Sequence, residues 1–248
     1  KYVTYFAGKG CTLFNFGADE YANDIYSTGG MGFAQLVSAG QYDEFVAYIN
    51  DLAAMIKDAD MTPMVFNDGI YYNRITTNAI DEDIMVAYWS SGWSGYNVAS
   101  ASFLADQGFQ MINTNGDYYW VLGKDAQCSA EKAAGFDATA FMGSSTISDP
   151  AGAMFCIWCD VPGADTADSV VADTKDTLIA FGGALTGTTE DGGNESGITD
   201  GNVTDENTGI SVKAAGLNGL EVTEKESASV TISGAVAAVA YDIAPSID

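Results

Sequence analysis

Short runs of mainly apolar residues recur along the first two thirds of the chain, and a polar or aromatic loop follows each of them. There are five such runs, at residues 11–16, 62–66, 84–89, 109–113 and 153–158. Strands that are buried on both faces have this continuous apolar pattern, which is typical of a parallel sheet covered by helices. The pattern therefore predicts an α/β fold built on parallel strands.

Amphipathic segments between these runs predict the covering helices. Between residues 41 and 61 the apolar residues recur at helical spacing, at Phe45, Ile49, Leu52 and Ile56. Asn97 is predicted to cap a helix that Gly108 ends, and Thr166 is predicted to cap a helix that carries Val170. Strands and helices thus alternate, as they do in a doubly wound sheet or a (β/α)8 barrel.

The barrel is the favoured architecture. No GxGxxG or Walker motif follows a strand, which leaves little support for a nucleotide-binding doubly wound sheet. The apolar runs also carry their Trp, Tyr, Asn or Asp residues at the C-terminal end, where barrel enzymes place their active sites. Because a closed barrel needs eight strands and five runs are present, we predict a partial TIM barrel over residues 1–182.

The composition changes near residue 182. Residues 183–207 are rich in Gly, Thr, Asp and Asn, which predicts a linker. Residues 208–248 alternate between apolar and polar positions with a period of two. This alternation predicts a small all-β module of immunoglobulin-like type with antiparallel strands, truncated at its C-terminal end.

One pair of adjacent carboxylates differs in context from the other acidic residues of the chain. Asp19 and Glu20 follow the first apolar run through Gly17 and Ala18, so a strand and a glycine-permitted turn would place both at the rim of the sheet. Other adjacent acidic residues lie in polar sequence without an apolar run before them. We therefore interpret Asp19 and Glu20 as candidate catalytic groups.

Aromatic and polar side chains gather at the same predicted strand ends. The set comprises Trp89, Trp93, Trp120, Trp158, Tyr71, Tyr72, Tyr118 and Tyr119, together with Asn67, Asp68, Asn113, Asn115 and Asp160. Indole and phenol rings suit the apolar face of a pyranose, whereas amides and carboxylates suit its hydroxyls. Any single aromatic residue of the set has core packing as an equal alternative. Two carboxylates beside such a box indicate glycoside hydrolysis.

The net charge of −25 argues against a nucleic-acid partner and against an anionic membrane surface. The chain has no histidine and a single CxxC motif, from Cys156 to Cys159, so we predict neither a metal nor a cofactor and expect the four cysteines to fill the core. No run is long enough to insert into a membrane, and no signal peptide opens the chain. Because Lys1 is the first residue, we expect a piece of a longer protein.

Five segments, in this order along the chain, resemble the catalytic barrel of glycoside hydrolase family 20. They are FNFGADEYAND, PMVFNDGIYYN, WSSGWSGYNVAS, INTNGDYYWVLG and IWCDVPGA. The resemblance covers residues 10–182 and is strongest to the bacterial surface-attached exo-β-N-acetylhexosaminidases. It implies that these segments belong to barrel strands four to eight, with strands one to three upstream of Lys1.

The resemblance also implies a mechanism and a role for each acidic residue. Glu20 would be the general acid that protonates the leaving oxygen and then the base that activates water. The 2-acetamido carbonyl of the substrate would attack the anomeric carbon, giving an oxazolinium intermediate and net retention, while Asp19 orients the acetamido group. Tyr119, with Tyr118 as the alternative, would donate a hydrogen bond to that carbonyl.

The remaining site residues are carried over by the same resemblance. Trp89 and Trp158 match the positions that wall the acetamido pocket, and Asp160 matches one that binds sugar hydroxyls. Asn67 and Asp68 stand where the family lines the pocket near the acid, although many relatives have a Trp around that strand end. The family's sugar-binding Arg and its His come from the early strands, which the five segments do not include.

The predicted function is hydrolysis of terminal β-linked N-acetylhexosamine from glycans by a secreted or cell-surface bacterial enzyme. Three alternatives stay open: a lacto-N-biosidase of the same family, a non-catalytic carbohydrate-binding surface protein, and an acidic α/β domain without a sugar site. The presence of both Asp19 and Glu20 counts against a non-catalytic protein. As an isolated fragment, the partial barrel could not close, and we expect it to have little activity.

Overall fold

The computed structural model describes residues 1–20, 32–75, 77–93, 95–124 and 127–186, and the backbone of four short strands beyond residue 212. The chain divides into two compact units. The first comprises Lys1–Asn113 and Thr139–Pro150, and the second comprises Thr114–Ala138 and Ala151–Asp248.

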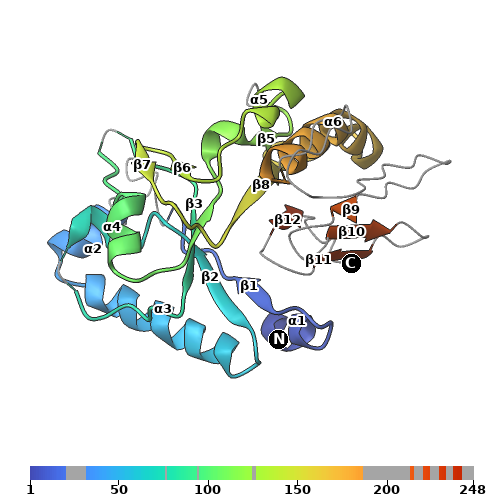
Figure 1. The fold of residues 1–248 in the computed structure, drawn as a ribbon. Coiled ribbons are helices and arrows are strands. Elements are labelled where there is room, and N and C mark those ends of the chain that lie inside the picture. Colours follow the sequence, from blue (N-terminus) through green and yellow to red (C-terminus); the bar gives the residue numbers. More distant parts are fainter. Residues whose placement is uncertain are drawn as a thin grey trace. The chain divides into compact units, whose positions relative to one another are not determined.

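The first unit is built on four parallel strands. They are β1 (Leu13–Asn15), β2 (Thr62–Phe66), β3 (Met85–Tyr88) and β4 (Met111–Asn113), and they pair in this order. Residues of β2 and β3 are almost all buried, which confirms the prediction of parallel strands covered on both faces. Because the strands are parallel, the loops after β1, β2 and β3 leave from the same edge of the sheet (Figure 1).

Helices cover this sheet, with α3 (Tyr42–Lys57) beside β2 (Figure 1). Val46, Ile49, Ala53 and Ile56 form the buried stripe of α3, at the three- and four-residue spacing of an amphipathic helix. The unit also contains α1 (Tyr2–Ala7), α2 (Phe33–Ser38), the 3-10 turn η1 (Tyr72–Arg74) and a short hairpin of β6 (Ala140–Phe141) and β7 (Ser145–Thr146). The helix predicted between residues 41 and 61 is therefore confirmed.

The helix α4 (Ala101–Asp106) begins later than predicted. Ser100 is its N-terminal cap, because its extended backbone lets Oγ accept a hydrogen bond from the Phe103 N–H at 3.3 Å. Asn97 does not cap the helix. Its N–H donates to the Tyr72 hydroxyl at 3.1 Å, and its carbonyl accepts from the Asn73 N–H at 2.8 Å. Asn97 therefore joins two loops.

Gly69, in the loop after β2, lies at a point of close packing. A Cβ atom at this position would lie 2.6 Å from Phe33 Cζ, 2.9 Å from Phe45 Cζ and 2.9 Å from the carbonyl oxygen of Ala18. Contacts this short are not tolerated between non-bonded heavy atoms. The absence of a side chain at Gly69 therefore lets the loops after β1 and β2 approach each other.

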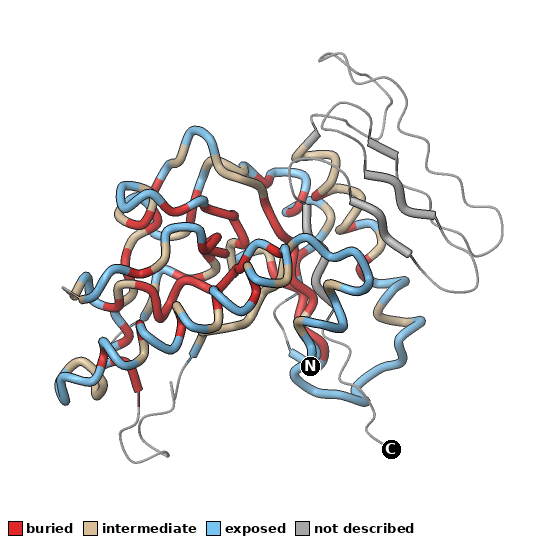
Figure 2. The backbone as a smooth tube through the Cα atoms, turned by 90° about the horizontal axis from the view of Figure 1, so that it is seen from below, coloured by how far each residue is buried: buried red, intermediate tan, exposed pale blue. Residues whose placement is uncertain are grey.

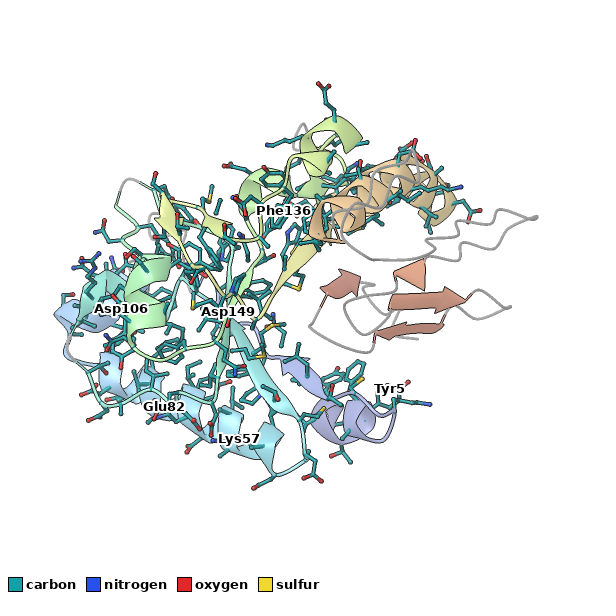
Figure 3. All side chains as sticks on the ribbon, viewed as in Figure 1. Tyr5, Lys57, Glu82, Asp106, Phe136 and Asp149 are labelled. Carbon is teal, nitrogen blue, oxygen red and sulfur yellow. The ribbon has the colours of Figure 1, made fainter. Side chains whose placement is uncertain are left out.

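The second unit has its own parallel strands and hydrophobic core. The strand β8 (Gly152–Trp158) pairs in parallel with β5 (Trp120–Val121) and with β12 (Ala237–Tyr241). The turn η2 (Gly116–Tyr118) and helices α5 (Ala130–Ala134) and α6 (Ala167–Thr186) complete the elements before residue 187. Phe136, labelled in Figure 3 where α5 approaches α6, packs against Phe181 with ring centroids 4.5 Å apart. Thr166 Oγ1 accepts from the Ser169 N–H at 3.2 Å, so the predicted cap of α6 is confirmed.

The C-terminal strands differ in part from the predicted module. The strands β9 (Lys213–Ala214), β10 (Leu220–Thr223) and β11 (Ser229–Ile232) form an antiparallel sheet. The last alternating segment, predicted to belong to the same antiparallel module, instead supplies β12, which pairs in parallel with β8. Of the predicted linker 183–207, the first four residues belong to α6 and the rest lies outside the described residues.

Burial follows the predicted pattern at four of the five apolar runs, whereas residues 11–16 are half-buried or exposed. Figure 2 shows the buried residues, in red, running through the strands, whereas the helices expose their outer turns. Cys128 and Cys156 are buried, but Cys11 and Cys159 are exposed, so the expectation that all four cysteines fill the core is wrong for two of them. Within the described residues, no helix combines the length and the apolar character that crossing a membrane requires.

Candidate active site

The acid pair follows β1, as the sequence predicts. Backbone pairing continues past the strand, because the Phe16 N–H donates to the Met64 carbonyl at 3.0 Å and the Phe66 N–H donates to the Gly17 carbonyl at 2.8 Å. Gly17 then has a φ of 86°, a left-handed conformation that glycine adopts without strain. This turn delivers Asp19 and Glu20 to the edge of the sheet where the loops after β2 and β3 also lie.

Asp68, in the loop after β2, joins the three loops at this edge. Its carboxylate is fully buried. Oδ2 accepts hydrogen bonds from the Glu20 backbone N–H at 2.7 Å and from the Tyr96 hydroxyl at 3.2 Å, and Oδ1 accepts from the Trp89 indole N–H at 2.8 Å. Charge-assisted hydrogen bonds of this kind are stronger than neutral ones. The Asp68 carboxylate therefore holds both the Glu20 backbone and the Trp89 indole in position.

Asn67 fixes the start of the loop after β3. Its side chain is also fully buried. Oδ1 accepts from the Trp89 N–H at 2.9 Å and from the Ser90 N–H at 3.3 Å, and Nδ2 donates to the Ser90 carbonyl at 2.8 Å. The amide thereby satisfies backbone groups that the end of β3 would leave unpaired. The residue predicted to line the pocket thus also supports the backbone beneath Trp89.

Two carboxyl groups at this edge of the sheet, those of Asp19 and Asp68, have raised pKa values. Burial raises the pKa of Asp68 to about 6, against its hydrogen bonds, and the negative charge of Asp19 raises it further. Burial also raises the pKa of Asp19. The pKa of Tyr96 is raised by burial and then by the negative charges of Asp68 and Glu20. Such coupled shifts are common at functional sites because catalysis requires tuned protonation states.

The raised pKa of Asp68 predicts a pH dependence of stability. The folded protein binds the Asp68 proton more tightly than the unfolded chain does. This tighter binding stabilises the fold in full below pH 3.8, the ordinary pKa of the group, and the stabilisation is lost as the pH rises through about 6. We expect this group to lower the free energy of unfolding by roughly 2–3 kcal/mol across that window. Urea unfolding of the wild type and of Asp68→Asn at several pH values measures this change. A difference between the two proteins that stays constant with pH would contradict the assignment.

Aromatic rings extend the site along the loop after β3. Trp89 is half-buried, and its ring lies 6.3 Å from that of Trp93. Trp93 stacks on Tyr96 with centroids 4.2 Å apart and an interplanar angle of 9°. Sequence reasoning included both tryptophans but missed Tyr96, because nothing local in the sequence indicates that its hydroxyl reaches Asp68.

The second unit holds the other predicted site residues. Tyr119 and Trp158 lie together, with ring centroids 5.8 Å apart at 60°. Tyr118 instead packs edge-on against Phe136 at 4.9 Å, and the contact of either tyrosine with substrate stays a prediction. The exposed Asp160 forms an ion pair with Lys124 at 2.6 Å.

Trp120 and Cys156 are both buried in the interior of this unit. Trp120 is only 4% exposed and belongs to the hydrophobic core with Phe155, so it packs in the core, and its contact with substrate stays a prediction. Burial raises the pKa of the Cys156 thiol to about 11, which keeps the thiol protonated near neutral pH. Within the described part of the chain, no three His, Cys, Asp or Glu side chains are grouped to hold a metal.

No protein-family model matches the chain. Among solved structures it is similar to the pneumococcal exo-β-D-N-acetylglucosaminidase StrH, which has tandem GH20 catalytic modules, with 36% identity and a TM-score of 0.61 over 74% of this chain and 45% of that chain. A second structure of StrH, a pneumococcal virulence factor studied for N-glycan recognition and hydrolysis, gives 37% identity and a TM-score of 0.64 with the same coverage. Dispersin B is 21% identical with a TM-score of 0.54, over 72% of this chain and 57% of that chain, and this likeness concerns the fold alone.

The chain thus spans less than half the length of the StrH chains that it matches. Its parallel strands and these neighbours fit part of a TIM barrel, as the sequence predicts. The ordered motifs, the acid pair at the end of a parallel strand and the likeness to StrH agree with one another. The chain is therefore a relative of glycoside hydrolase family 20.

Proposed function

We propose that the protein hydrolyses terminal β-linked N-acetylhexosamine from glycans with retention of configuration. The observation that carries the proposal is the buried Asp68 carboxylate, which holds both the Glu20 backbone and the Trp89 indole. Because Glu20 and Trp89 are both hydrogen-bonded to the buried Asp68, their relative position is fixed. Catalysis depends on such positioning. The identity of 36–37% to StrH, an exo-β-D-N-acetylglucosaminidase, supports this class of substrate.

In the proposed mechanism the substrate supplies its own nucleophile. The 2-acetamido carbonyl oxygen attacks the anomeric carbon while the glycosidic bond breaks and Glu20 gives its proton to the leaving oxygen. Asp19 accepts a hydrogen bond from the acetamido nitrogen, whose positive charge it stabilises in the oxazolinium intermediate. Water then attacks the anomeric carbon and gives a proton to Glu20, while the bond from the anomeric carbon to the acetamido oxygen breaks and its electron pair returns to the acetamido group. This second displacement restores the original configuration.

The aromatic residues would hold the sugar ring for this attack. Trp89 and Trp158 wall the acetamido group, and the Tyr119 hydroxyl donates to its carbonyl and directs it at the anomeric carbon. Asp160 binds ring hydroxyls. To do so, its carboxylate would leave the exposed ion pair that it forms with Lys124. Exposed ion pairs contribute little to stability, so this exchange costs little free energy.

A substrate series tests the proposal on the full-length protein. We expect hydrolysis of the 4-nitrophenyl N-acetyl-β-glucosaminide, and a kcat/KM at least about 100-fold lower for the β-glucoside that lacks the acetamido group, because an intramolecular nucleophile gives a large advantage. The N-trifluoroacetyl substrate should react more slowly than the N-acetyl one, since fluorine withdraws electrons from the attacking carbonyl. Equal rates on all three substrates would contradict substrate assistance.

The place of action follows from the same proposal. An enzyme that trims glycans acts where those glycans are displayed, so we propose a secreted or cell-surface bacterial protein. The likeness to a pneumococcal virulence factor supports this place of action.

A further inference from the structure

Cys156 lies within β8, and its thiol is a buried polar group that the proposed mechanism does not use. The side chain is only 2% exposed. Its hydrogen-bonding neighbours include the Thr114 hydroxyl, whose oxygen lies 3.1 Å from Sγ, and the Tyr119 side chain. All three residues belong to the second unit. The thiol therefore connects a threonine just after β4 to the tyrosine for which we propose a contact with the acetamido carbonyl.

The pairing of β5 with β8 explains why Cys156 and Tyr119 meet. Trp120 is in register with Ile157, and both side chains belong to the hydrophobic core of the unit. Tyr119 and Cys156 each come one residue earlier, and the backbone of Tyr119 is extended, with φ −72° and ψ 152°. Successive side chains of extended strands point to opposite faces of a sheet. Tyr119 and Cys156 therefore lie side by side on the face opposite to that core.

Trp158 lies on the same face of β8, two residues after Cys156. Its ring is packed against the Tyr119 ring, with centroids 5.8 Å apart at 60°, and the Tyr119 hydroxyl oxygen is buried. The indole thus restricts the phenol ring. The phenolic proton can still rotate about the bond between ring and oxygen, so the hydrogen-bonding neighbours of the oxygen decide where it points.

The Cys156 thiol can act as a hydrogen-bond donor because it stays protonated near neutral pH. Burial raises its pKa to about 11, although the hydrogen bonds of Thr114 and Tyr119 act in the opposite direction. A thiol has one S–H donor, and its sulfur is also a weak acceptor. The Thr114 hydroxyl can therefore donate to the sulfur while the S–H donates to the Tyr119 oxygen. The Tyr119 proton can then be donated to the substrate.

We propose that Cys156 is a positioning residue, which accepts a hydrogen bond from Thr114 and donates one to the Tyr119 hydroxyl, so that the tyrosine directs its proton at the acetamido carbonyl. The inference rests on the proposed function for the role of Tyr119. Hydrogen bonds in such a chain polarise and strengthen one another. In this role Cys156 acts through Tyr119 and needs no contact with the sugar.

A double-mutant cycle with Tyr119→Phe tests whether Cys156 acts through the tyrosine. The full-length protein is assayed on the 4-nitrophenyl N-acetyl-β-glucosaminide. We expect Cys156→Ala to lower kcat about fivefold, the usual contribution of a neutral hydrogen bond, with KM unchanged. In the Tyr119→Phe background the same substitution should have no effect, because the hydroxyl that the thiol orients is gone. Cys156→Ser keeps a donor and should restore most of the wild-type kcat.

Cys128→Ala is the matched control, because it removes another buried thiol of the same unit. The Cys128 thiol donates to the Ser129 carbonyl at 3.5 Å, so its loss should leave kcat unchanged. The thermal unfolding midpoint of each variant reports whether it is folded. A merely structural effect of Cys156→Ala would lower kcat by the same factor with and without the Tyr119 hydroxyl.

The outcomes separate this inference from the proposed function. If Cys156→Ala has the wild-type kcat, or lowers kcat equally in both backgrounds, the positioning role is overturned and the proposed function stands. The same holds if Cys156→Ser is no more active than Cys156→Ala. If the wild-type protein does not hydrolyse the substrate, the proposed function itself fails, and the positioning role with it.

Discussion

Glu20→Gln is expected to lower kcat on the N-acetyl-β-glucosaminide by roughly 10²- to 10⁴-fold, the usual contribution of a general acid. Glutamine has nearly the same shape as glutamate, so the sugar should still bind and KM should change little. The amide cannot protonate the leaving oxygen or activate water. Steady-state kinetics on the full-length protein measures both constants.

The leaving group provides an internal control for this prediction. A 2,4-dinitrophenyl leaving group needs less protonation than a 4-nitrophenyl group. The fall in kcat caused by Glu20→Gln should therefore be smaller on the 2,4-dinitrophenyl substrate. Glu44→Gln changes an exposed acid in the first turn of α3 and should leave both rates unchanged. A Glu20→Gln protein as active as the wild type would exclude Glu20 as the acid.

Asp68→Asn is expected to reduce kcat/KM by roughly 100-fold, because small displacements of catalytic groups have effects of this size. The carboxylate accepts from three donors through both oxygens, whereas an amide offers one acceptor oxygen and one NH₂ group. The NH₂ group of the substituted side chain would therefore face another donor. Either the backbone N–H of Glu20 or the Trp89 indole would lose its partner.

Tyr96→Phe is the matched comparison for Asp68→Asn. It removes one of the three donors and retains the ring that stacks on Trp93, so its effect on kcat/KM should be several-fold smaller. Circular dichroism at 222 nm and the thermal unfolding midpoint report whether each protein is folded. A full loss of activity in Tyr96→Phe with normal activity in Asp68→Asn would contradict the prediction that the Asp68 substitution has the larger effect.

Much of the fold could be predicted because the parallel strands leave a local signal. The runs at residues 62–66 and 84–89 are almost entirely apolar, and β2 and β3 are buried on both faces apart from Thr62. The acid pair could be predicted for the same reason, since it follows an apolar run and a glycine. Both inferences depend on residues that are adjacent in sequence.

The contacts that organise the site depend on distant residues and could not be predicted. Asp68 meets Glu20 and Trp89 because β1, β2 and β3 pair in register, which no local pattern specifies. Asn97 and Ser100 are equally good helix caps by residue type, and the choice is decided by the hydrogen bond between Asn97 and Tyr72. The C-terminal alternation likewise indicates a strand at β12 but not its parallel pairing with β8.

Gly69 has a consequence for how sequence variation at this site should be interpreted. The missing side chain leaves room for the Ala18 carbonyl one residue before the acid pair, and for the rings of Phe33 and Phe45. Gly69 has no side chain that could take part in chemistry, yet its replacement would disturb the acid pair as surely as a change in a reacting group. If Gly69 is invariant among related proteins, the reason would be this steric requirement. Its invariance would not indicate contact with the glycan.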